Sequence, residues 1–283
     1  AVTLLKHRDS TLLGLEPELS ALVEEALVRH GCVLLRNAPL YGVDAGADGA
    51  VAVVQAGGES LPADLLVLAM GVRPESGLAE RAGLDIGDAG AIEVDDRAVT
   101  SAPEILAAGD CATQRHLVSG RRLFLSQALA ANRQGRVAGA QAALALLGRD
   151  DEAPRDPGTV GTAVKKVFDV EAAHAGLNLA AARHAGFDAF ATTITSSTRA
   201  GYAPGAGPVK VALIAERGTG RLLGGQVAGS PGAAKRVDVL ATALQAGFDL
   251  QQVATLDLGY APPFSPLWDP VLIAARVALK KVG

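Results

Sequence analysis

The sequence has few cysteines, few aromatic residues and no long apolar run, and each shortage argues against a class of protein. Its 283 residues contain two cysteines and no Cys-x-x-Cys pair, which gives neither a disulfide framework nor a zinc site. The richest apolar stretch, 137–147, is too short and too interrupted by glycine and glutamine to span a bilayer. A formal net charge of −4 gives no basic surface for nucleic acid. We therefore predict a cytoplasmic protein without a metal site and without nucleic-acid or membrane partners.

The chain is instead rich in small and apolar residues. Hydrophobic residues make up 49% of it, which excludes a disordered chain. The 33 glycines fit helices that pack closely on sheets and phosphate-bearing ligands that lie near the backbone. The length is sufficient for two domains with sizeable cores.

Strand and helix signals alternate in the first part of the chain. We expect strands at 2–5, 32–35, 51–54 and 64–71, a helix from Pro17 to Gly31, and a loop at 37–48. The apolar run at 64–71 is typical of a strand covered on both faces. The order of strand, helix and strand is typical of the middle of a doubly wound α/β unit, although no Gly-x-Gly-x-x-Gly fingerprint occurs. The nearest candidate, Gly224–Gly229, fits a strand that meets a turn better than a phosphate-binding loop.

The middle of the chain predicts a short apolar strand at 105–110, which ends in Gly109-Asp110, and a long alanine-rich helix at 126–147. The polar stretch 148–158 contains two prolines and is the main predicted domain boundary. Beyond it, the pattern predicts an antiparallel sheet with helices on one side, an α+β layer. Its expected strands are 160–167, 189–195, 209–215 and 222–228, and its expected helices are 177–185, 231–246 and 270–279.

A proline-rich segment, 257–270, holds four prolines, the single tryptophan and one of the three tyrosines. Proline fixes φ and removes an amide donor, so this segment can be neither a central strand nor a helix interior. Such a stiff run holds side chains in place, either to cap the core where a C-terminal helix docks or to serve a site. Composition alone favours the first explanation.

Two motifs resemble the flavin site of flavoprotein reductases with two dinucleotide-binding domains. The strand end at Gly109 and Asp110 resembles their second flavin fingerprint, in which glycine lets the backbone approach a ligand and the carboxylate accepts hydrogen bonds from ribitol hydroxyls. The helix that contains Ala131 and Asn132 resembles the one that points its amino end at the flavin pyrimidine ring. Its positive end would stabilise the anion that forms there on reduction.

Further motifs resemble coenzyme A-disulfide reductases and their NADH oxidase and NADH peroxidase relatives, and the resemblance covers essentially the whole chain. The stretch 68–74, with Gly71, matches the crossing from the NAD(P) domain back into the flavin domain. Four motifs match the dimerisation domain: 161–168, 201–205, 235–242 and 257–270.

The resemblance implies an α/β plus α+β chain, in which partial doubly wound NAD(P)- and FAD-binding domains precede an antiparallel-sheet dimerisation domain. The implied divisions are 1–74, 75–155 and 156–283. Neither Cys32 nor Cys111 matches the family's redox-active cysteine, so we expect the C-terminal portion of a longer enzyme. By itself the chain is expected to retain little or no FAD and not to catalyse the full reaction.

The implied activity is that of an FAD-dependent NAD(P)H:disulfide oxidoreductase that forms a homodimer. In this scheme NAD(P)H reduces FAD, and the flavin reduces a disulfide that involves the redox cysteine. Tyr260, and Tyr202 as the second candidate, would reach the other subunit's redox cysteine and donate to, or with a lowered pKa protonate, the leaving thiolate. The sequence departs from the family at Arg199, where histidine is common, and at Ala203, where a second tyrosine is common. Phe264 and Trp268 are expected to anchor the segment.

Lys6, His7 and Arg8 lie where NADH-dependent relatives carry an acid for the ribose hydroxyls. A basic cluster would attract a 2′-phosphate, so we expect NADP in preference to NAD, with NAD possible. The small-molecule acceptor is expected to be coenzyme A disulfide or a related persulfide. Two alternatives stay open, namely reduction of oxygen or peroxide on the same scaffold, and a non-catalytic dimerising fragment.

Overall fold

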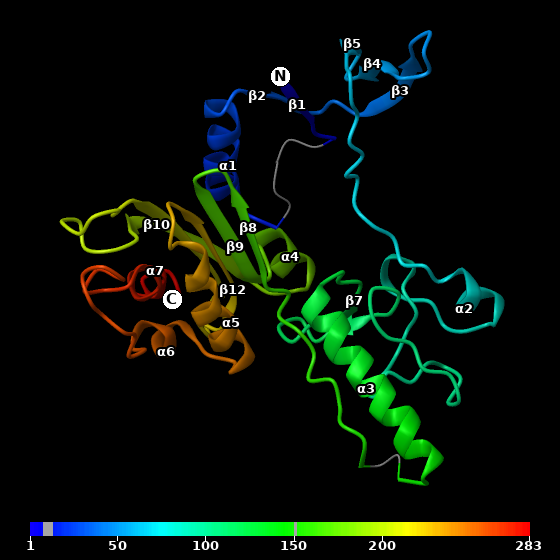
Figure 1. The fold of residues 1–283 in the computed structure, drawn as a ribbon. Helices are drawn as coiled ribbons and strands as arrows, with labels where there is room; N and C mark the ends of the chain where they lie inside the picture. Colours follow the sequence, from blue (N-terminus) through cyan, green and yellow to red (C-terminus); the bar gives the residue numbers. More distant parts are fainter. Residues whose placement is uncertain (8–13, 150–151) are drawn as a thin grey trace. The chain divides into compact units, whose positions relative to one another are not determined.

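The computed structural model describes residues 1–7, 14–149 and 152–283. The chain falls into two compact units, one formed by 1–69 together with 163–283 and the other by 70–162. Figure 1 shows the helices and strands of both units. The three-part division at 74 and 155 stays a prediction.

The predicted strand–helix–strand start is confirmed. Strand β1 (Val2–Leu5) runs parallel to β2 (Cys32–Leu35), and helix α1 (Pro17–Arg29) connects them. Proline occupies the first position of α1, where its missing N–H costs no helical hydrogen bond, and Gly31 turns the chain after it at a φ of 82°.

The loop expected at 37–48 is wrong in its central part. Strand β3 (Leu40–Ala45) pairs with β4 (Val51–Ala56), and β4 pairs with β5 (Glu59–Pro62), in an antiparallel three-stranded sheet. The glycines and aspartates here predict a loop by local preference, but pairing with β4 overrides that preference.

The strand expected at 64–71 is not formed. The segment has no regular secondary structure, and its apolar side chains are exposed, for example Leu65 at 78%, Val67 at 75% and Met70 at 79%. An apolar strand of this kind gains stability only from neighbouring strands and from layers over both faces. Among the described residues, the parallel sheet of this unit consists of β1 and β2, and neither strand pairs with this run.

A five-stranded antiparallel sheet with the order β10-β11-β12-β9-β8 confirms the predicted second layer. Strand β9 was not expected, because its alanine-rich sequence has low strand propensity. It is nevertheless the neighbour of both β12 and β8. The bounds are β8 (Ala163–Val167), β9 (Val170–Gly176), β10 (Ala189–Ser197), β11 (Pro208–Glu216) and β12 (Leu222–Gly229).

Helices pack on both faces of this sheet, which corrects the expectation of helices on one side. Helix α1 places Leu19 and Val23 against Ala228 and its neighbours on one face. On the opposite face, helix α5 brings Leu240 against Gly225 of β12. Helices α4 (Leu179–His184), α5 (Val237–Gln245), α6 (Leu250–Ala254) and α7 (Pro270–Leu279), and the 3-10 turn η3 (Ala234–Arg236), complete this part.

The unit 70–162 contains the predicted long helix, α3 (Ala128–Leu146). The strand expected at 105–110 is reduced to an isolated bridge between Leu106 and Val99, because this segment folds back on a turn and finds no longer partner. The remaining elements are α2 (Gly77–Arg81), the 3-10 turn η1 (Asp88–Gly90), and the strands β6 (Gln114–Arg115) and β7 (Arg122–Leu123). No helix within the described ranges is both long and apolar enough to cross a membrane.

Candidate functional site

The structure brings Asp110 to the beginning of α3, next to Gly109. Gly109 has a φ of 93°, and a Cβ built on it would meet nothing within 4 Å. The Asp110 carboxylate accepts a hydrogen bond of 2.7 Å from the hydroxyl of Ser126, which lies just before α3. A backbone open to close approach and an oriented carboxylate at a helix start fit the ribityl part of FAD.

Ala131 and Asn132 lie near the amino end of α3, where the predicted flavin-binding helix begins. Gln127 is the residue directly before α3, and its side chain does not cap the helix. Its side-chain amide instead donates to the Thr162 carbonyl at 3.3 Å. The first N–H groups of a helix lack partners within it, and its amino end carries partial positive charge. This end of α3 therefore suits a group that becomes negatively charged.

Two residues that contact Gly109 or Asp110 were not predicted from the sequence, namely Gln134 and Ser126. Gln134 is 2% exposed, and its side chain bonds the Gly109 N–H at 2.9 Å and the Thr113 carbonyl at 3.0 Å. A glutamine among the apolar positions of a helix was the signal that could have identified it, because buried polar side chains are almost always hydrogen-bonded.

The other predicted nucleotide-binding residues lie in other segments of the chain. Gly71 lies in an exposed extended segment at a φ of 92°, and it makes none of the hydrogen bonds that join Gly109 and Asp110 to α3. Lys6 and His7 follow β1 at its carboxyl end, the end at which parallel sheets bind nucleotides. The Lys6 main chain is fixed by Leu35, whose carbonyl accepts at 2.8 Å. Arg8 lies outside the described residues.

The two predicted catalytic tyrosines lie together on two loops of the five-stranded-sheet part. Tyr202 is 79% exposed and Tyr260 is 47% exposed. The main-chain N–H of Ala200 donates to the Pro262 carbonyl at 3.1 Å and so joins the two loops. The pKa of Tyr260 is raised, first by desolvation and then by the nearby Tyr202 phenol. A raised pKa makes the phenol a weaker acid, so the lowered pKa that proton transfer to the thiolate would require is not found at position 260. Its available chemistry is hydrogen-bond donation.

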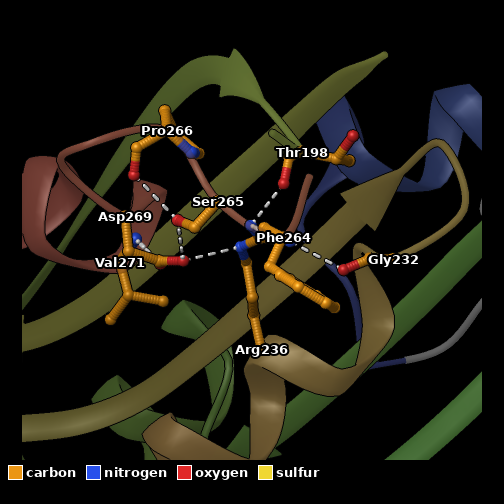
Figure 2. Close-up of polar contacts among 8 residues, drawn as sticks. All are labelled: Thr198, Gly232, Arg236, Phe264, Ser265, Pro266, Asp269 and Val271. Carbon is orange, nitrogen blue, oxygen red and sulfur yellow. Dashed lines mark hydrogen bonds and ion pairs between the residues drawn. The ribbon is translucent and has the colours of Figure 1, made fainter. Parts of the chain in front are cut away.

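Polar contacts around Ser265 and Asp269 hold the proline-rich segment (Figure 2). The expectation that Phe264 anchors it is wrong, since that side chain is 78% exposed. Trp268 lies 3.7 Å from the Arg276 guanidinium, which stacks over its ring, and is 49% exposed. Ser265 is buried, at 4% exposure, and donates to Asp269 at 3.1 Å. In this segment the Phe264 ring is therefore exposed, while the Trp268 ring packs on Arg276.

Neither a metal-binding cluster nor a disulfide is found within the described residues. No group of three or more histidine, cysteine, aspartate or glutamate side chains there could hold a metal ion. Cys32 and Cys111 are free thiols.

Comparison with known families gives two matches that together span most of the chain. Residues 1–144 match the model of the pyridine nucleotide-disulphide oxidoreductases, and residues 162–270 match the dimerisation domain of the same family. The boundary between the matches falls after α3, close to the predicted boundary at 148–158.

Individual relatives point to reductases of sulfur compounds and to oxidases. The NAD(P)H coenzyme A polysulfide/persulfide reductase of Pyrococcus horikoshii is 38% identical over 93% of this chain and 56% of its own length. The NADH oxidase of Methanocaldococcus jannaschii is 31% identical over 95% of this chain and 58% of its own length. The structure of an NAD-dependent persulfide reductase from A. fulgidus superposes with a TM-score of 0.91 at 40% identity, over 99% of this chain and 51% of that one. The chain thus spans between half and three fifths of the length of these relatives.

Proposed function

Because the chain belongs to the pyridine nucleotide-disulphide oxidoreductase family, we propose that it forms part of a flavin-dependent NAD(P)H:disulfide oxidoreductase. The proposed substrate is coenzyme A disulfide or a related persulfide. The name of the P. horikoshii relative supports this substrate class, as does the persulfide reductase with the same fold. We further propose a cytoplasmic location, which agrees with two free cysteines.

The observation that carries the proposal is that Tyr202 and Tyr260 lie, with exposed phenols, on two loops that the Ala200 N–H joins to the Pro262 carbonyl at 3.1 Å. In the proposed reaction a sulfur–sulfur bond breaks, and one sulfur leaves as a thiolate. A protonated phenol that points at this sulfur donates a hydrogen bond and stabilises its developing charge. Tyr260 suits this role because its phenol is protonated at its ordinary pKa or above and is 47% exposed, and Tyr202 lies on the adjoining loop.

The flavin and nucleotide sites follow from the residues already described. When bound, FAD would take a hydride from NAD(P)H and supply the electron pair that reduces the disulfide. Asp110 would accept hydrogen bonds from the ribityl hydroxyls, and the amino end of α3, with Ala131 and Asn132, would face the pyrimidine edge. Lys6 and His7 would lie near the adenosine ribose and favour NADPH. NADH is the alternative, which the similarity to the NAD-dependent A. fulgidus reductase supports.

We propose that the active form is a homodimer, in which the tyrosine loops of one subunit complete the site of the other. The apolar side chains on and beside these loops are exposed, including Phe264 at 78% and Leu267 at 65%. Aromatic residues are enriched at protein interfaces, and exposed ones in a cluster mark a binding surface. Light scattering at rising concentration tests the dimer, and a monomer at every concentration would refute it.

The test of the proposed function is turnover of coenzyme A disulfide by the complete gene product, with Tyr260→Phe as the diagnostic variant. Removal of the hydroxyl should lower kcat by roughly ten- to a hundredfold, since one hydrogen bond to developing charge is lost. Tyr41→Phe is the control, because Tyr41 is an exposed tyrosine on β3, at 72%, outside the two loops. Unchanged turnover in Tyr260→Phe would contradict the proposed role of Tyr260 as a hydrogen-bond donor to the leaving sulfur.

A second candidate is reduction of oxygen or peroxide, which the M. jannaschii relative favours because it is named an NADH oxidase. An oxygen electrode separates the two, since an oxidase consumes oxygen with NAD(P)H in the absence of any disulfide. The third possibility, a non-catalytic dimerising fragment, would give a colourless dimer without flavin absorbance.

A further inference from the structure

Arg236 is a buried arginine that bonds to several parts of the chain at once (Figure 2). It ends η3 directly before α5, and it is 8% exposed. Its Nε donates to the Asp269 carboxylate at 3.0 Å, and its Nη1 donates to the Gly232 carbonyl at 2.7 Å. Its Nη2 donates to the Thr198 carbonyl at 2.6 Å and lies 3.4 Å from the Phe264 carbonyl.

Two of these acceptors belong to the loops that carry the tyrosines. Thr198 lies four residues before Tyr202, and Phe264 lies four residues after Tyr260. The guanidinium therefore bonds to one loop just before its tyrosine and to the other just after its tyrosine. Its side chain comes from the helical segment below and enters between the two stretches of backbone (Figure 2).

Asp269 fixes the direction in which the guanidinium points. Besides Arg236, its carboxylate accepts from the Ser265 hydroxyl at 3.1 Å and from the Val271 N–H at 2.9 Å, so it also caps α7. A buried arginine requires such a counter-charge, since an unpaired charge in the interior is strongly unfavourable. The pair thus ties the loops to two helices.

We propose that Arg236 is the positioning residue that holds Tyr202 against Tyr260. This inference rests on the proposed function of the tyrosine pair. Arginine suits the position because its planar fork of donors can bind a carboxylate and several carbonyls at once, whereas a lysine ammonium donates from a single point. Without the guanidinium, the loops lose the bonds to Thr198 and Phe264 and keep the main-chain bond of 3.1 Å from Ala200 to Pro262.

The test compares Arg236→Lys with the unmodified chain by NMR of ring-labelled tyrosine. The chain has three tyrosines, so the ring signals can be assigned with single Tyr→Phe variants. The unmodified chain should show a cross-peak between the rings of Tyr202 and Tyr260. Arg236→Lys should lose this cross-peak while the ring signals of Tyr41 stay in place.

Two further variants separate positioning from general stability. Leu240→Ala opens a cavity in α5, one turn beyond Arg236, where the side chain packs on Gly225. It should lower the Tm and keep the tyrosine cross-peak. Asp269→Asn retains a good helix cap but removes the counter-charge, so it should weaken the cross-peak even if Arg236→Lys fails to fold. A cross-peak of full intensity in Arg236→Lys, or in Asp269→Asn, would overturn the proposal.

Turnover of the complete gene product distinguishes this inference from the proposed function. Arg236→Lys should lower kcat for the disulfide by about tenfold, because misplaced groups lose rate, and leave KM for the nucleotide unchanged. If Arg236→Lys loses the cross-peak while Tyr260→Phe turns over normally, the positioning role stands and the proposed function fails. If Tyr260→Phe is slow and Arg236→Lys keeps both the cross-peak and its rate, the positioning role alone fails.

Discussion

The side chain of Gln134 holds the main chain of Gly109 through a hydrogen bond of 2.9 Å from the glycine N–H. The same amide donates to the carbonyl of Thr113 at 3.0 Å, so one residue of α3 fixes both sides of the turn that carries Asp110. The position of the proposed ribityl-binding carboxylate therefore depends on a buried amide that does not itself face the ligand.

Replacing Gln134 by leucine should destabilise the unit that contains α3. The Gly109 N–H and the Thr113 carbonyl would lose their partner, and the free energy of unfolding should fall by about 2–4 kcal/mol. Urea unfolding followed by circular dichroism measures this change. Gln141→Leu is the matched control, because Gln141 is buried on the same helix and its Oε1 has no partner among the described residues. A loss in Gln141→Leu as large as in Gln134→Leu would contradict this account.

Two glycine-to-alanine changes should act in opposite directions. A Cβ on Gly224 of β12 would lie 2.0 Å from the Leu177 carbonyl oxygen, so Gly224→Ala should cost about 3 kcal/mol or more, or prevent folding. A Cβ on Gly139 of α3 would meet nothing within 4 Å, and Gly139→Ala should stabilise by about 0.5–1 kcal/mol, because alanine loses less backbone entropy in a helix. Thermal unfolding of both variants checks the signs. A stable Gly224→Ala protein would show that the close packing of β12 on the main chain of Leu177 is not required.

The sequence predicted best those elements whose signals are local. Helix α1 has proline at its start and glycine after its end, and the β11–β12 hairpin has a glycine-rich turn between apolar runs, so neighbouring residues suffice to locate them. The prediction of a strand at 64–71 was wrong because a strand covered on both faces requires partner strands from elsewhere in the chain. Strand β9 was not predicted because its pairing with neighbouring strands, and not its alanine-rich composition, makes it a strand.

The same division applies to the candidate site. Gly109 and Asp110 were singled out from a motif, because a Gly-Asp pair at a strand end can be recognised in the sequence, and their role in binding flavin stays a prediction. Gln134 and Arg236 were not predicted, since both are buried and their distant partners lie 21 to 38 residues away along the chain. Contacts of this kind cannot be inferred from the spacing of residues in the sequence.

A buried histidine, His116, and a partly buried one, His174, give the stability of this chain a dependence on pH. Burial lowers the pKa of His174 on β9, and the nearby positive charge of Lys165 lowers it further. The ring also lies against Gly14, where an added Cβ would come within 3.2 Å of His174 Cε1. Burial also lowers the pKa of His116 in the other unit, partly offset by a backbone hydrogen bond to Val160. Both side chains are therefore neutral when the protein is folded near pH 7.

Below pH about 6.5, the unfolded chain should take up protons that the folded chain resists, so stability should fall with pH. The contribution of each histidine to the free energy of unfolding is fully present above its pKa in the unfolded chain. It is lost as the pH falls toward its lower pKa in the folded chain, by up to about 1.4 kcal/mol per pH unit. Urea unfolding at intervals from pH 7.5 to pH 5 measures this slope. His174→Gln should flatten it in the unit that contains β9, while His184→Gln, at an exposed position on α4, controls for the loss of a histidine as such. If His174→Gln and His184→Gln gave the same slope as the unmodified chain, the burial of His174 would not be the source of the acid sensitivity.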